Sequence, residues 1–214
     1  MKLLKACLLL HVIAFFMLCQ TAGAASESEP LESVKVTVDS MLDLMKDKSL
    51  SGPEKSLERR DRMKQLIDTR FDFREMSRRS LARHWKKITS AEQNEFVKLF
   101  SVLLQNSYIN KIEEYTDEKI SYNKAVIKKN GKYSVVKTSV FSKDIIIPID
   151  YKLKQKDGEW RVYDVMVEGV SIVSNYRSQY GKILSRQPYS ALIQKMKDKL
   201  GKTETLYSGY LVNK

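Results

Sequence analysis

The stretch that decides the fold is residues 145–167, IIIPIDYKLKQKDGEWRVYDVMV. Between residues 145 and 153 apolar side chains occupy every second position, which is the period of a β-strand with one buried face. Asp157-Gly158 then supplies the positive φ angles of a two-residue hairpin turn, and a second β-rich run follows at 159–167. Because the link is so short, the two strands must be antiparallel neighbours.

Two more β-rich runs precede this hairpin, at about 118–129 and 132–142, and Asn130-Gly131 joins them with the same turn chemistry. A three-residue link connects them to the quoted stretch. The sequence therefore predicts a four-stranded antiparallel meander. Pro148 cannot donate a ladder hydrogen bond, which indicates an edge strand or a bulge at that position.

Helical periodicity surrounds the meander. Apolar residues recur at three- and four-residue steps over 31–45, and again in two segments beyond Gly169. The pattern of a helix start with a capping box occurs twice, opening at Ser51 and at Thr89. The order helices, meander, helices predicts an α+β fold, with the terminal helices wrapping one face of the sheet.

Residues 1–24 have the three parts of an export signal. Lys2 and Lys5 precede an apolar run over 6–18 that is too short to span a bilayer, and a small-residue stretch follows. We expect export and cleavage near Ala24.

Removing this leader from the 214 residues leaves 190, enough for one domain with a substantial core. We expect a single domain over 25–200 and a flexible tail over 201–214. Without the two leader lysines, 36 basic residues against 26 acidic ones leave a net charge of +10. Both cysteines lie in the leader, and His84 is the one histidine left. The mature chain therefore excludes disulfides, cysteine metal sites, thiol catalysis and sites that need two histidines.

The mature sequence has few residues suited to catalysis. His84 lies among basic residues, which favours a surface or structural role, and the acidic run near residue 115 is typical of a solvated helix end. Strand alternation places Asp164 on the face of Trp160 and Val162, where a buried carboxylate needs hydrogen-bond partners. We expect Asp164 to be a structural anchor, to Arg177 or to backbone amides. The sequence predicts no enzyme, metal or cofactor.

Residues 58–87 are strongly basic, with eleven Lys or Arg against five acids. In a cytosolic protein this would suggest nucleic acid, but export argues against such a partner. An anionic membrane surface or a solvated face without a partner remain open. Composition likewise leaves open whether the apolar residues pack solidly or enclose a cavity.

Two blocks of sequence resemble the MlaC (toluene-tolerance) family. The first comprises Phe71-Asp72-Phe73, Leu81, Trp85, Thr89-Ser90-Ala91-Glu92-Gln93 and the apolar stripe that follows from Phe96 to Tyr108. The second comprises GEWRVYDV at 158–165, EGVS at 168–171 and NYRSQY at 175–180. The resemblance spans about 31–200. This chain has Ala82 where the family often has Gly, and Tyr180 where it usually has Phe.

The resemblance implies a nuclear-transport-factor-two-like cone with extra helices and an apolar cavity. It also implies a periplasmic phospholipid carrier that needs no cofactor. Its partners would be an outer-membrane lipoprotein complex, an inner-membrane ABC transporter with a lipid-binding subunit, and transiently the membrane itself. From the resemblance and the predicted faces we expect thirteen residues to contact lipid tails: Phe73, Leu81, Trp85, Phe100, Leu103, Leu104, Tyr108, Ile147, Ile149, Tyr151, Val165, Val170 and Tyr176.

Three alternatives remain at this stage. The protein could be an exported adaptor with a solid core, whose basic face docks on envelope proteins or anionic lipid. It could be a carrier of hopanoid-type lipids, which relatives of the family handle. It could also be a hydrolase that uses Asp164.

Overall fold

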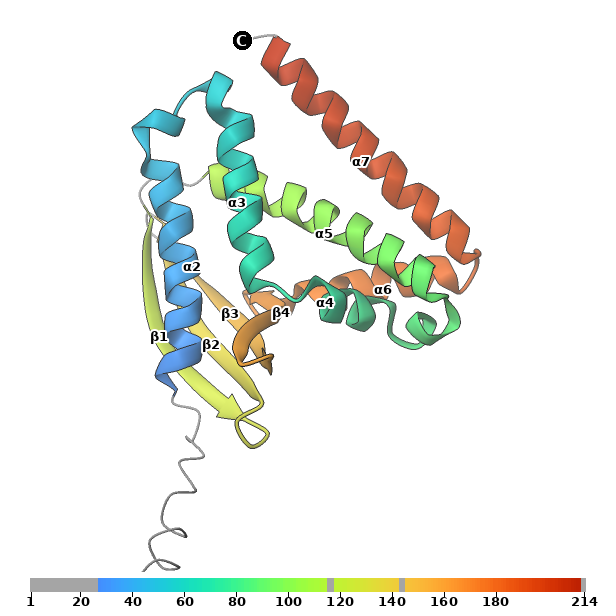
Figure 1. The fold of residues 1–214 in the computed structure, drawn as a ribbon, viewed down its shortest axis with the longest axis horizontal. Helices are drawn as coiled ribbons and strands as arrows, with labels where there is room; N and C mark the ends of the chain where they lie inside the picture. Colours follow the sequence, from blue (N-terminus) through green and yellow to red (C-terminus); the bar gives the residue numbers. More distant parts are fainter. Residues whose placement is uncertain (1–26, 115–117, 143–144, 213–214) are drawn as a thin grey trace, which may run out of the picture.

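The computed structural model describes residues 27–114, 118–142 and 145–212 and has the expected α+β architecture (Figure 1). The leader and its cleavage site lie outside the described residues. The elements, in chain order, are α2 (Ser28–Lys46), η1 (Lys48–Leu50), η2 (Pro53–Lys55), α3 (Ser56–Arg70), α4 (Phe73–Leu81), η3 (Ala82–Lys87), α5 (Ser90–Glu113), β1 (Lys119–Lys128), β2 (Tyr133–Ser142), β3 (Ile145–Lys156), β4 (Glu159–Val167), β5 (Val170–Ser171), α6 (Ile172–Leu184) and α7 (Tyr189–Val212).

The sheet is an antiparallel meander in the order β1-β2-β3-β4-β5, with five strands where four were predicted. The extra strand follows a turn at Glu168 and Gly169, whose φ angles are 50° and 80°. This turn pairs Val167 with Val170. The two-residue strand β5 is too short to show any alternation, so the sequence pattern could not reveal it.

Pro148 lies in an interior strand, because β3 pairs with both β2 and β4. The prediction of an edge strand is therefore wrong for β3. Pro148 is tolerated because β4 ends at Val167, the partner of Ile149, so no ladder hydrogen bond is required from its nitrogen. The carbonyl of Pro148 instead accepts a hydrogen bond from the Glu168 amide at 2.9 Å.

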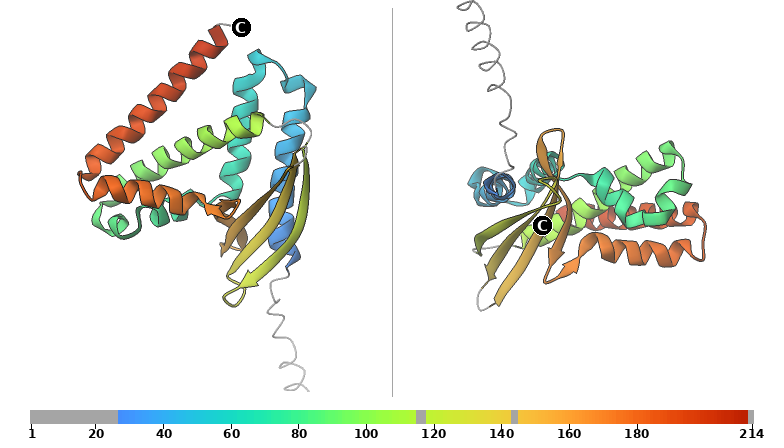
Figure 2. Two further views of the ribbon diagram at one scale, coloured as in Figure 1. Left: turned by 180° about the vertical axis from the view of Figure 1, so that it is seen from behind. Right: turned by 90° about the horizontal axis from the view of Figure 1, so that it is seen from below.

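The helices form two groups around the sheet. α2 lies lengthwise against the sheet, and α3 returns beside it, whereas α4, α6 and α7 form a lobe beyond the β4 edge (Figures 1 and 2). α5 belongs to both groups. It packs on α4 and α7 in the lobe and reaches α3 at its other end.

The helical lobe is solidly packed. The rings of Phe96 and Phe100 stack at 5.6 Å, and Tyr176 and Tyr180 contact Phe100 edge-on at 5.2 and 5.9 Å. Apolar side chains from α4, η3 and α7 complete this cluster. A smaller cluster joins α2 to the sheet, and another joins α2, α3 and α5.

Helix ends follow the local sequence, with two exceptions. The capping box of α5 is present: Thr89 Oγ1 accepts from the Glu92 amide at 3.2 Å, and the Glu92 carboxylate accepts from the Thr89 amide at 2.8 Å. The predicted helix start at Ser51 is wrong, because Gly52 has a φ of 94° and α3 begins only at Ser56. α7 continues to Val212 where a loose tail was expected, since extending an existing helix through Gly201 costs only about 1 kcal/mol.

Of the two departures from the family pattern, Ala82 and Tyr180, Ala82 adopts a strained backbone conformation. Its φ is 48° and its ψ is −120°, a region that glycine adopts far more readily. Ala82→Gly should therefore stabilise the protein by about 1 kcal/mol, a rise in Tm of about 2–4 °C by calorimetry. The matched control is Ala91→Gly in the first turn of α5, which should lower Tm. A lower Tm for Ala82→Gly would contradict this account.

Tyr180 carries a buried hydroxyl that finds no hydrogen-bond partner among the described residues. Removing a desolvated, unpaired hydroxyl should stabilise the fold, so we expect Tyr180→Phe to raise the free energy of unfolding by about 1 kcal/mol in urea titrations. Tyr189 is the control, because its hydroxyl donates to the Glu92 carbonyl at 3.0 Å. Tyr189→Phe should destabilise, and equal effects of the two substitutions would refute the assignment.

Candidate functional site

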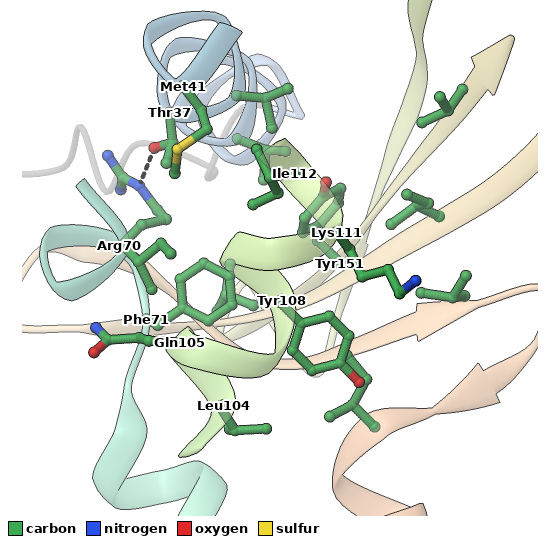
Figure 3. Close-up of a pocket in the computed structure, with 18 of the residues that line it drawn as sticks. Thr37, Met41, Arg70, Phe71, Leu104, Gln105, Tyr108, Lys111, Ile112 and Tyr151 are labelled. Carbon is green, nitrogen blue, oxygen red and sulfur yellow. Dashed lines mark hydrogen bonds between the residues drawn. The ribbon is translucent and has the colours of Figure 1, made fainter. Parts of the chain in front are cut away.

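A cavity of about 680 Å³ lies between the sheet and helices α2, α3 and α5 (Figure 3). Its walls come from every layer of the fold. The sheet supplies Ile120, Val140, Ile147, Ile149, Tyr151, Val162, Val167 and Val170. The helices and the segment before α4 supply Val34, Thr37, Val38, Met41, Leu42, Ile67, Arg70, Phe71, Phe73, Met76, Leu104, Gln105, Tyr108, Lys111, Ile112, Ile172 and Asn175.

The lining is mostly apolar, and its volume is typical of small-molecule sites. Its two charged residues, Arg70 and Lys111, are both basic, and no carboxylate lines the cavity among the described residues. A cavity of this composition favours a hydrophobic ligand.

Arg70 is held in the wall by hydrogen bonds within the protein. Its Nε donates to Thr37 Oγ1 at 3.1 Å, and its guanidinium donates to the Trp160 carbonyl at 2.9 Å (Figure 3). Burial lowers the pKa of Arg70, and the nearby charge of Arg161 lowers it further. The side chain thereby links α3 to α2 and β4 at the edge of the cavity.

The two tyrosines of the lining stay neutral. Burial raises the pKa of Tyr151 to about 12. Burial also raises the pKa of Tyr108, with a smaller contribution from Tyr176. Both rings therefore present uncharged surfaces near neutral pH.

The cavity opens to solvent between α5 and the start of α6. Four of its lining residues are exposed: Tyr108 and Lys111 on α5, Val170 on β5 and Asn175 on α6. In Figure 3 Tyr108 and Lys111 project from α5 toward the strands. These four residues define the mouth of the cavity.

The structure places seven of the thirteen predicted tail-contacting residues in the cavity wall: Phe73, Leu104, Tyr108, Ile147, Ile149, Tyr151 and Val170. Their contact with a lipid stays a prediction. The other six do not line the cavity. Leu81, Trp85, Phe100, Leu103 and Tyr176 belong to the helical lobe, and Val165 packs between the sheet and α2.

The division within α5 has a geometric cause. A helix of 24 residues is about 36 Å long, so its two halves can border different parts of the fold. Its first half, around Phe96 and Phe100, packs in the lobe, whereas its second half from Leu104 onward faces the cavity. Periodicity shows which stripe of a helix is buried but does not show what it is buried against.

Sequence reasoning missed the contribution of α2 and α3 to the site. Val34, Val38 and Met41 line the cavity along α2, and Ile67 and Arg70 line it from α3. The signal was available for α2, because its apolar face recurs at helical spacing. The pattern predicted helices over one face of the sheet but did not indicate that α2 and α3 share a cavity with α5.

Asp164 is an anchor that binds a backbone amide, which is one of the two expected partners, but it does not bind Arg177. A bulge in β4 skips Tyr163, so that Lys152 pairs with Asp164 and the next residue, Leu153, with Val162. The bulge turns Asp164 to the sheet face opposite Val162, which corrects the alternation argument.

The carboxylate of Asp164 has its acceptor positions filled. It accepts from Lys152 Nζ at 3.1 Å, from Ser171 Oγ at 2.7 Å and from the Val173 amide at 3.2 Å. It thereby fixes the start of α6, while Arg177 donates instead to the Arg79 carbonyl at 2.8 Å. Asp164 does not line the cavity.

The basic segment 58–87 is partly paired within the fold and keeps an excess of positive charge. Six of its eleven cationic side chains lie within ion-pair distance of a carboxylate. Hydrogen bonds from Arg78 and Arg79 hold the pKa of Glu75 at about 2. In the part of the chain that the structure describes, no helix combines the length and apolarity needed to cross a bilayer, and no cluster of three or more side chains could hold a metal ion.

The fold and the site define a class of protein in which helices close an antiparallel sheet around an apolar cavity. A comparison with models of protein families identifies the family. Residues 35–198 match the model of the MlaC protein family, and the chain belongs to that family.

Two curated relatives are similar over part of their length. The intermembrane phospholipid transport system binding protein MlaC of Haemophilus influenzae is 30% identical over 115 residues, which are 51% of this chain and 54% of that protein. The toluene tolerance protein ttg2D of Pseudomonas putida is 27% identical over 101 residues, 47% of each chain. The chain thus spans about half the length of the curated relatives it matches.

A solved structure shares the fold over a longer span. It is a phospholipid-binding protein from Ralstonia solanacearum in complex with a phospholipid. The TM-score is 0.71 with 21% sequence identity, and the match covers 82% of this chain and 99% of the other. At this identity the likeness establishes the fold.

The anchoring role of Asp164 makes a quantitative prediction. Asp164→Ala leaves Ser171 Oγ and the Val173 amide without their acceptor, and should destabilise the protein by about 2–3 kcal/mol in urea titrations. Asp61 is the control, because its exposed carboxylate makes a single long ion pair with Lys64 at 3.8 Å. Asp61→Ala should therefore leave the urea midpoint nearly unchanged. An unchanged midpoint for Asp164→Ala would contradict the anchor.

Proposed function

We propose that this protein is a phospholipid carrier that encloses acyl chain in the cavity and leaves the headgroup at the mouth. The observation that carries the proposal is the cavity of about 680 Å³, whose lining is mostly apolar. Family membership supports it, as do relatives named for phospholipid transport and a fold neighbour solved with a phospholipid.

The energetics of lipid transfer explain why such a cavity is needed. Each exposed methylene costs roughly 0.8 kcal/mol, so two chains of about 15 methylenes would cost on the order of 24 kcal/mol in water. A methylene occupies roughly the volume of a water molecule, about 30 Å³, so the cavity has room for on the order of twenty. One long chain fits entirely, with part of a second, which supports one lipid per protein.

The mouth suits the polar end of a lipid. Lys111 is exposed there and Asn175 lies opposite on α6, so a phosphate at this position meets a cation and an amide while remaining in solvent. Carriage needs no covalent step and no cofactor, and we infer that the protein is not an enzyme.

We further propose that the carrier works in the periplasm after cleavage near Ala24. It would receive and deliver lipid between an outer-membrane lipoprotein complex and an inner-membrane ABC transporter with a lipid-binding subunit. The name of the Haemophilus relative, which places it in an intermembrane phospholipid transport system, supports this assignment. Direction would come from those partners, because nothing in a passive cavity distinguishes uptake from release.

The other two classes of function have less support. An adaptor with a solid core leaves the cavity between the sheet and the helices unexplained. A hydrolase centred on Asp164 would need a free carboxylate facing the ligand, whereas this carboxylate is engaged on the other face of the sheet.

Ile149 provides the decisive test, because it lies on the sheet wall of the cavity. We expect native mass spectrometry of the wild-type protein, purified without detergent, to show one bound phospholipid. Ile149→Arg places an unpaired charge in the apolar interior and should reduce the lipid-bound fraction at least about tenfold.

The matched control is Val36→Arg, because Val36 is exposed on the side of α2 away from the cavity. This variant should keep its lipid. Circular dichroism and melting curves identify the variants that fold. A folded Ile149→Arg protein with a full complement of lipid would overturn the cavity assignment. If the bound mass is that of a polycyclic hydrocarbon, the ligand is a hopanoid-type lipid and not a phospholipid.

A further inference from the structure

Exposed apolar side chains gather at the mouth of the cavity. Among the described residues, seven large hydrophobic side chains are exposed, and five of them lie at or beside the mouth: Tyr108, Phe141, Ile145, Ile146 and Val170. The two remaining ones, Val36 and Leu57, lie on α2 and α3. We call the five residues the apolar rim.

The core of the rim is the end of the β2–β3 hairpin. Ile145 lies on the same face of β3 as Ile147, which lines the cavity, and it is 62% exposed. Ile146 is the next residue, so it points to the opposite face of the sheet, where it pairs with Phe141 and is 60% exposed. The two strands therefore carry apolar side chains on both faces beside the turn, whose residues 143–144 lie outside the described part of the chain.

The β4–β5 turn brings the rest of the rim beside this hairpin. The Glu168 amide donates to the Pro148 carbonyl at 2.9 Å, which fixes the turn two residues from Ile146 along β3. Val170, immediately after the turn, lines the mouth and is 63% exposed. Tyr108 borders the same opening from α5.

From this arrangement we propose that the apolar rim inserts into the surface of a phospholipid bilayer, with the cavity mouth facing the hydrocarbon. Adjacent strand residues point in opposite directions, so a single flat protein surface can cover Ile145 or Ile146 but not both. A fluid hydrocarbon layer surrounds a protruding hairpin from all sides and covers both. The occupant that fits strand ends with apolar side chains on both faces is therefore a lipid layer.

Insertion of the rim would let an acyl chain move between bilayer and cavity without crossing water. This inference rests on the proposed carrier function. An acyl chain leaving a bilayer passes through water unless an apolar path connects bilayer and cavity. Ile145 and Ile147 lie on one strand face and continue the cavity wall outward to the hairpin end. Lys119, exposed and paired with Phe141 across β1 and β2, is placed to meet headgroup phosphates as the tip enters.

Vesicles of phosphatidylethanolamine and phosphatidylglycerol, with and without brominated acyl chains, test this proposal. Each buried isoleucine contributes about tenfold or more to partitioning, so the double variant Ile145→Ser, Ile146→Ser should bind vesicles at least about a hundredfold more weakly in flotation assays. Val36→Ser, which removes an exposed side chain outside the rim, should bind like wild type.

A tryptophan at position 146 locates the contact. In Ile146→Trp the new ring points away from the cavity, so quenching by brominated chains reports insertion into the bilayer and not lipid held inside. We expect quenching there and none beyond background in Val36→Trp. Unquenched Trp at 146, or unchanged flotation of the double variant, would overturn the insertion.

The lipid content of the double variant separates the two proposals. Both isoleucines are outside the cavity lining, so native mass spectrometry should still find bound phospholipid in the folded double variant. If the double variant retains lipid and binds vesicles as well as wild type, the proposed insertion of the rim is refuted and the proposed carrier function is not. Quenching at position 146 in a protein that never holds lipid refutes the carrier and leaves the membrane contact.

Discussion

An apolar cavity of this size must be either filled or held open against collapse. An unfilled apolar cavity leaves its wall side chains either against water or without packing partners, and both conditions cost free energy. The spacing between α2, α5 and the sheet is therefore the constraint on which the rest of the structure depends. A guest molecule satisfies it most directly, and polar ties between the surrounding elements maintain it.

Three such ties surround the cavity. Arg60 of α3 donates to Asn110 and Glu113 of α5, which fixes the distance between those helices. Tyr122 of β1 donates to Asp39 of α2 at 2.6 Å, and Arg70 links α3 to Thr37 and to β4. Charge-assisted hydrogen bonds are directional and short, so they hold helices at a set separation where apolar contacts alone would draw them together. The solid aromatic lobe provides the rigid base from which α5 extends.

The four long strands, most helices and the Asp157-Gly158 turn could be predicted from sequence, because each depends on a local period or a local φ requirement. The bulge at Tyr163 could not, since one extra residue in a strand leaves the local composition unchanged while reversing the face of Asp164. Which apolar residues line the cavity depends on contacts between segments that are distant in sequence. Phe100 and Leu104 look alike on the α5 stripe and both pack in the lobe cluster, yet Leu104 also lines the cavity and Phe100 does not, because partners distant in sequence decide the difference. For the same reason, only the family resemblance favoured a hollow interior over a solid one.

The central claim is that the space between Ile149 and Tyr108 holds an acyl chain. The most direct measurement is a high-resolution crystal structure of the protein expressed in bacteria and purified without detergent. The account predicts continuous tubular electron density along the sheet wall, reaching a phosphate near Lys111 at the mouth. Helix α2 collapsed onto the sheet, with side chains filling the space and no such density, would contradict it.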